Sequence, residues 1–180
     1  MKRTGLILVL LVLINGLFWN CERRAGEPLV YDNRLVLVNP SLGNLTSLIS
    51  MMDDKVIDLP STELLTVHYA ETRYRYESIQ RFLENSPLSQ VRQELVEGEL
   101  TEENLFRENP CTHAFTRIFE ESDGMLFFGG ADFPPSIYGE KTDLLTSIQT
   151  PYRHYFELSF LFHLIGGSQD EEYQPLLSGK

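Results

Sequence analysis

The sequence predicts an α/β fold built on a parallel sheet, and three observations lead to this prediction. Short apolar runs of strand length alternate along the chain with segments whose apolar residues recur at helical spacing. One run, Met125 to Phe128, is apolar at every position, which is typical of a strand that helices cover on both faces. Gly129 and Gly130 follow it directly. A glycine pair there forms either an ordinary βα turn or a loop whose backbone N–H groups closely approach a ligand.

Composition places the chain among ordinary globular proteins. Its 180 residues are 42% hydrophobic and 11% aromatic, which is enough material for one core. The formal net charge of −11 makes nucleic acids and anionic lipid surfaces poor partners for the domain. The two cysteines form no C-x-x-C pair, and no two histidines have the spacing of a helical metal site. We therefore expect one domain with no nucleic-acid partner, no metal and no cofactor.

Residues 1–21 differ from the rest of the chain and predict an export signal. Lys2-Arg3 precede an apolar run at residues 6–14 that is too short to span a bilayer comfortably. Cys21 follows, as in a bacterial lipoprotein signal, although bulky aromatic residues replace the small ones usual before the acylated Cys. A buried helix and a retained hydrophobic anchor are the alternatives. We expect an exported, membrane-anchored protein with Cys21 as the lipid anchor and residues 22–33 as a polar tether.

The first half of the domain contains two βα units. Strands are predicted from apolar and β-branched runs, and helices from apolar residues at helical spacing beside capping and proline signals. The predicted elements are a strand at residues 34–39, a helix that Ser41 caps and that spans residues 42–52, a strand at residues 64–69, and a helix at residues 74–83.

The second half is less regular before the apolar run and more regular after it. Residues 86–109 are acidic and weakly periodic. Within them, residues 93–99 fit either a short strand or a helix end, and residues 101–106 fit a capped helical turn. Two helices are predicted beyond this region: residues 112–121, with an apolar stripe facing the sheet, and residues 152–164, mostly aromatic and closed by Gly166-Gly167.

Two stretches carry a resemblance to a known family. Gly129-Gly130-x-Asp132-x-x-Pro135-x-x-Tyr138-Gly139-Glu140 resembles a loop of the class I glutamine amidotransferase-like hydrolases, in particular the γ-glutamyl-γ-aminobutyrate hydrolase (peptidase C26) group. Arg153-His154-Tyr155-Phe156-Glu157-Leu158 is similar to the start of the next helix in that family. The resemblance implies that residues 34–180 are the N-terminal part of a flavodoxin-like three-layer α/β/α domain, with a mainly parallel sheet incomplete at the C-terminus.

The resemblance also implies an activity and a site. Family members hydrolyse γ-glutamyl amides with a Cys nucleophile that a His activates and a Glu orients. Gly129 and Gly130 match the loop that supplies an oxyanion-hole amide, and the pocket rim is matched by Asp132, Tyr138 and Glu140. The nucleophile motif Gly-x-Cys-x-Gly does not occur in the sequence. We expect a γ-glutamyl or glutamine-like substrate but no turnover by this chain alone; the alternative is a non-catalytic, membrane-tethered α/β binding lipoprotein.

Other reactive side chains are better explained by structure than by catalysis. Cys111 has no strand before it and no glycine beside it, so it lacks the strained turn of a nucleophile and fits a half-buried thiol at a helix start. The four histidines fit hydrogen-bonded structural roles. Arg153 and Glu157 stand at i, i+4 spacing and predict an ion pair on the helix surface, although Glu157 could also point toward an active site.

Overall fold

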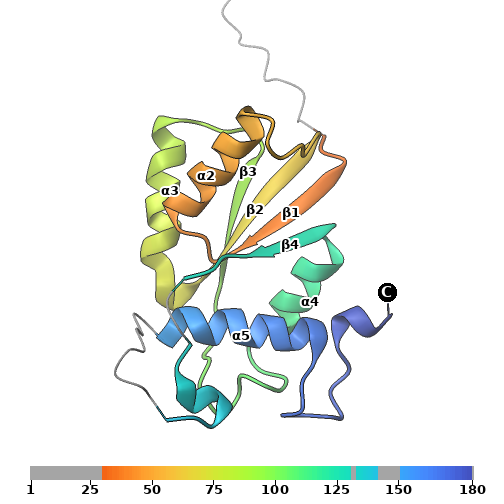
Figure 1. Ribbon diagram of the computed structural model, residues 1–180. Coiled ribbons are helices and arrows are strands. Elements are labelled where there is room, and N and C mark those ends of the chain that lie inside the picture. The colour runs from red at the N-terminus through yellow and green to blue at the C-terminus, as the bar shows by residue number, and fades with distance from the viewer. Residues whose placement is uncertain (1–29, 131–132, 142–150, 180) are drawn as a thin grey trace, which may run out of the picture. The chain divides into compact units, whose positions relative to one another are not determined.

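The structure of this protein is a computed structural model, which describes residues 30–130, 133–141 and 151–179. It confirms the predicted fold class: an all-parallel sheet of four strands flanked by helices, as in flavodoxin-like three-layer α/β/α folds (Figure 1). The elements are β1 (Asn33–Val38), α2 (Leu42–Asp53), β2 (Thr62–Tyr69), η1 (Ala70–Thr72), α3 (Arg73–Asn85), β3 (Val91–Val96), α4 (Thr112–Glu120), β4 (Gly124–Phe127), η2 (Pro135–Tyr138), α5 (Pro151–Ile165) and η3 (Leu176–Gly179).

The strand order β3-β2-β1-β4 determines where a site can form. β1 pairs with β2, with Val38 opposite Val67, and on its other side with β4, with Val38 opposite Phe127. The chain adds β2 and β3 on one side of β1 and then returns to place β4 on the other side. In open parallel sheets, ligands bind outside the carboxyl ends of the strands at this point of reversal. We therefore expect a ligand site at the carboxyl ends of β1 and β4.

Two hydrophobic cores fix the helices on opposite faces of the sheet (Figure 1). Alternate strand residues point to opposite faces, so Val36 and Val38 face one core while Leu37 faces the other. The first core joins the sheet to α4 and α5 through aromatic side chains, including Phe115, which is stacked on Phe160 at 4.3 Å between ring centroids. The second core joins the sheet to α2 and α3 through leucine and isoleucine side chains.

Two predicted helix ends, the start of α2 and the end of α5, are confirmed. Ser41 is the N-cap of α2: its hydroxyl accepts a hydrogen bond from the backbone N of Asn44 at 3.1 Å, and its own N donates to Asn44 Oδ1 at 2.9 Å. Gly166 follows the last residue of α5 with a φ of +69°, and its N donates to the carbonyl of Phe162 at 2.7 Å. No helix in the described part of the chain is long and apolar enough to cross a membrane.

Three local expectations are resolved or corrected. Within the ambiguous segment at residues 93–99, residues 93–96 belong to a strand, β3, and residues 97–99 follow it. The predicted helical turn at residues 101–106 is a hydrogen-bonded turn in which the N of Thr101 donates to Asn104 Oδ1 at 2.8 Å. β4 pairs only with β1 among the described strands, so the apolar run expected in the middle of the sheet lies at its edge there, and its residues are half-buried.

Candidate functional site

The loop after β4 lies at the carboxyl edge of the sheet, and its two glycines are exposed. A Cβ on Gly129 would meet no other described atom within 4 Å. A Cβ on Gly130 would lie 2.7 Å from Cζ of Arg153, well inside van der Waals contact. The backbone of Gly130 therefore lies directly on the guanidinium group of Arg153, and only glycine permits this approach.

Arg153, in the first turn of α5, fastens this loop to the helix. Its Nη2 donates to the carbonyl of Phe128 at 2.9 Å, and its Nε donates to Glu157 Oε1 at 2.7 Å. The Arg153 and Glu157 side chains are 8% and 5% exposed, so the prediction of a surface ion pair is wrong. The pair is buried because α5 packs its first turns against the carboxyl edge of the sheet. Burial raises the pKa of Glu157, and the nearby charge of Arg153 opposes that shift.

A second polar group lies at the end of β1. Asn39 is buried and has a left-handed backbone with a φ of +46°. Its carbonyl accepts a hydrogen bond from Arg75 Nη1 at 2.9 Å, and its side-chain Oδ1 accepts one from Thr72 Oγ1 at 3.0 Å. Arg75 also lowers the pKa of Glu157 through its charge. Arg75 of α3 thus binds the end of β1 and Arg153 of α5 binds the end of β4. The charges of both arginines act on Glu157.

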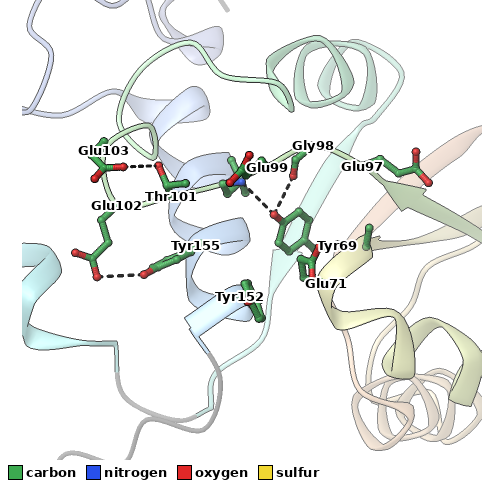
Figure 2. A pocket seen from close by; sticks show the side chains of 12 residues that line it. Tyr69, Glu71, Glu97, Gly98, Glu99, Thr101, Glu102, Glu103, Tyr152 and Tyr155 are labelled. Atoms are coloured by element: carbon green, nitrogen blue, oxygen red, sulfur yellow. Dashed lines mark hydrogen bonds between the residues drawn. The ribbon is translucent and has the colours of Figure 1, made fainter.

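An acidic cleft of about 760 Å³ opens at the carboxyl ends of β2 and β3 (Figure 2). Tyr69, the last residue of β2, shapes it: its hydroxyl donates to the carbonyl of Gly98 at 2.8 Å and accepts from the N of Leu100 at 3.1 Å. On the opposite wall, the hydroxyl of Tyr155 donates to Glu102 at 3.1 Å. Tyr152 of α5 also lines the cleft, and its carboxylates are those of Glu71, Glu97, Glu99, Glu102 and Glu103.

The cleft combines negative charge with aromatic surface, which suits a ligand that carries a positively charged amine. Burial raises the pKa of Tyr155, and its hydrogen bond with Glu102 adds to that shift, so the phenol remains a hydrogen-bond donor at neutral pH. Among the described residues, no group of three His, Cys, Asp or Glu side chains could hold a metal ion. The cleft offers negative charge from its glutamates and hydrogen-bonding hydroxyls from its tyrosines.

The predicted rim residues are only partly described. Asp132 and the predicted lipid anchor Cys21 lie outside the described residues. Tyr138 is the last residue of η2, and Gly139 follows it with a φ of +82°. Glu140 is exposed, and its N donates to the carbonyl of Pro135 at 2.9 Å. The structure thus brings Gly130 together with Arg153, and the rim assigned to Asp132, Tyr138 and Glu140 stays a prediction.

Cys111 is fully buried rather than half-buried, at the N-cap of α4. Burial raises the pKa of its thiol to about 11, so the thiolate is scarce at neutral pH. Its sulfur contacts the carbonyls of Glu97 and Gly98, at 3.8 Å and 3.9 Å. His163 is buried as well, with its ring nitrogens near Ser159 O at 2.6 Å and Thr112 Oγ1 at 2.8 Å. Both side chains are buried and held by contacts with neighbouring backbone and side-chain groups.

Sequence reasoning did not find Asn39, Arg75 or the acidic cleft. The cleft has a signal in the sequence. A segment that fits a strand is followed by the acidic residues Glu97, Glu99, Glu102 and Glu103. Asn39 left a weaker one: a polar residue directly after a strand and before Pro40. No protein-family model, curated protein or solved structure matches this chain.

Proposed function

We propose that this chain is a class I glutamine amidotransferase-like hydrolase domain that binds a γ-glutamyl amide at the carboxyl edge of its sheet, and that it does not turn the amide over on its own. One observation carries the proposal. The two stretches that resemble the family touch each other: Arg153 from the second donates to the carbonyl of Phe128, just before the Gly129-Gly130 loop, and packs under Gly130. A contact between two separately identified motifs at a ligand-binding edge supports a shared site.

The surrounding charges fit the proposed ligand. A γ-glutamyl amide carries an α-ammonium group, and the neighbouring cleft is lined by five glutamates and three tyrosines. The exposed loop at Gly129 and Gly130 can present backbone N–H groups to the amide carbonyl. In this proposal the loop holds the oxygen of the amide and the cleft holds the amine.

We expect no turnover because Cys111 is a poor nucleophile. Cys111 is buried, its pKa is raised to about 11, and its sulfur contacts backbone carbonyls rather than a base. A donor loop without a nucleophile can polarise a carbonyl but forms no tetrahedral intermediate.

A second candidate function is a membrane-tethered binding lipoprotein without catalysis, which Lys2-Arg3 and the short apolar run before Cys21 favour. This candidate adds acylation of Cys21, which would be seen as palmitate labelling in a bacterial host. Labelling should disappear in Cys21→Ser; labelling that persists in this variant would contradict the lipid anchor.

The proposed function is tested by titrating the full chain with γ-glutamyl-p-nitroanilide, with the α-glutamyl isomer as the control ligand. We expect saturable binding of the γ isomer, and a loss of affinity of about tenfold in Arg153→Gln, because the loop is no longer fastened to α5. Arg81→Gln, at an exposed position in α3, is the matched control and should bind as the wild type does. Release of p-nitroaniline should stay at background in the wild type and in Cys111→Ala. Equal affinity for both isomers, or turnover that depends on Cys111, would contradict the proposal.

A further inference from the structure

Asn39 has a conformation that its neighbours impose. A non-glycine residue with a φ of +46° is uncommon, although Asn tolerates the left-handed region better than most residues. Its backbone is held on both sides: the N donates to the carbonyl of Val67 at 2.7 Å, and the carbonyl accepts from Arg75 Nη1. Strained backbone of this kind gathers at ligand sites. The Asn39 side chain thus lies at the end of β1, on the side of β2 and of Thr72.

Only the oxygen of the Asn39 side-chain amide has a hydrogen-bond partner among the described residues. Asn39 is 1% exposed, and its Oδ1 accepts the hydrogen bond from Thr72 Oγ1. Its Nδ2 is buried and has no hydrogen-bond partner among the described residues. Buried donors in folded proteins are almost always paired, with protein, with ordered water or with a ligand. The free Nδ2 is therefore an observation separate from the backbone strain, and it calls for an acceptor at this place.

Arg75 supplies the charge beside this donor. Its Nη1 is bound to the carbonyl of Asn39 and its Nε donates to Tyr74 Oη at 3.2 Å, so the guanidinium is fixed while the side chain stays half-buried. The hydrogen bonds among the described residues leave its Nη2 available. Glu157, the carboxylate that feels the charge of Arg75, is already paired with Arg153. The positive charge of Arg75 is thus not neutralised by that carboxylate.

We infer that Asn39 and Arg75 form a subsite for a small oxyanion, the carboxylate or phosphate group of a small molecule. A fixed guanidinium beside a primary amide donor is the arrangement that accepts such a group through charge-assisted hydrogen bonds. The subsite lies at the carboxyl end of β1, on the side of β2, η1 and α3, at the edge of the sheet where open parallel sheets bind ligands. It requires neither the Gly129-Gly130 loop nor a nucleophile, so it does not depend on the proposed function.

A buried water molecule bonded to Nδ2 is the competing explanation, because water commonly satisfies such groups. The two explanations differ in their response to added anions. A water molecule satisfies Asn39 without involving the charge of Arg75. An oxyanion needs both residues, and its affinity must fall when either one is changed.

The inference is tested by titrating the full chain with glutarate and, separately, with inorganic phosphate, at constant ionic strength and with calorimetric detection. Asn39→Asp keeps the size of the side chain, the acceptor for Thr72 and the tolerance of positive φ, but it replaces the donor by a negative charge. Arg75→Gln removes the guanidinium. Arg73→Gln, an exposed position two residues earlier, removes the same charge away from the subsite and is the matched control. Thermal unfolding of each variant checks that it is folded.

We expect saturable binding of one anion that weakens at least tenfold in both Asn39→Asp and Arg75→Gln and by less than about twofold in Arg73→Gln. Tighter binding of glutarate identifies the ligand group as a carboxylate, and tighter binding of phosphate identifies it as a phosphate. If Asn39→Asp fails to fold, Asn39→Gly, which keeps the backbone conformation and removes the amide, takes its place with the same expected loss. No saturable binding of either anion, or equal weakening in Arg73→Gln and Arg75→Gln, would overturn the inference.

Discussion

Gly129 and Gly130 are adjacent in the chain but differ in their surroundings. Alanine at position 130 must displace the guanidinium of Arg153, which is 8% exposed and fixed by hydrogen bonds to Phe128 and Glu157. We predict that Gly130→Ala lowers the free energy of unfolding by about 2 kcal/mol, roughly the value of a hydrogen bond to a charged group. Urea unfolding followed by circular dichroism measures this change.

Gly129→Ala is the matched control at the neighbouring position. A Cβ there meets open space, and alanine restricts the unfolded chain, so the free energy of unfolding should be unchanged or rise by up to about 1 kcal/mol. Equal destabilisation by the two substitutions would show that the loop is sensitive to any side chain and that Arg153 does not determine its conformation.

At the scale of elements, α5 joins the sheet to the site. Phe160 in its middle is fully buried, stacked on Phe115 and in edge contact with Phe127 of β4. We predict that Phe160→Ala costs about 3 to 5 kcal/mol in the free energy of unfolding, because a large buried side chain is lost and a cavity remains. Leu161, the next residue, is 38% exposed, and Leu161→Ala should change stability by no more than about 0.5 kcal/mol. Similar losses in both variants would mean that the whole helix, not its inner face, determines stability.

The elements that the sequence predicts well are those whose pattern is local. The apolar spacing of α2 and the Gly166 signal after α5 depend on neighbouring residues only, and the structure confirms both. β3 could not be assigned because Val91 to Val96 mix charged and apolar residues, as befits a strand with one neighbour. The burial of Arg153 and Glu157 depends on how α5 meets the sheet, which i, i+4 spacing cannot reveal. The Gly129-Gly130 loop was predictable, but its partner was not.

At the scale of the whole molecule, the two faces of the sheet bury ionisable groups in different charge states. On the α4–α5 face Glu157 is buried with a charged partner, whereas on the α2–α3 face His68 is fully buried in edge contact with Tyr76. Burial, with a smaller effect of the charge of Arg75, lowers the pKa of His68 to about 3. His68 therefore stays neutral in the folded protein at pH 5 and above.

This neutrality makes global stability depend on pH in a predictable direction. The pKa of His68 is lower in the folded than in the unfolded state, so its contribution is fully present above pH 6.5 and is lost as pH falls toward 3. Between pH 7 and pH 5 the unfolded His68 becomes protonated while the folded one does not, which should cost about 2 kcal/mol in the free energy of unfolding. Glu157, whose pKa is raised by burial, acts in the opposite direction, so the test compares variants that both keep Glu157. Urea unfolding at both pH values should show a pH 7 to pH 5 loss that is smaller by about 2 kcal/mol in His68→Gln than in the wild type. His113→Gln, at an exposed position, should keep the loss of the wild type. An unchanged loss in His68→Gln would mean that His68 takes up a proton in the folded state and that its burial does not keep it neutral.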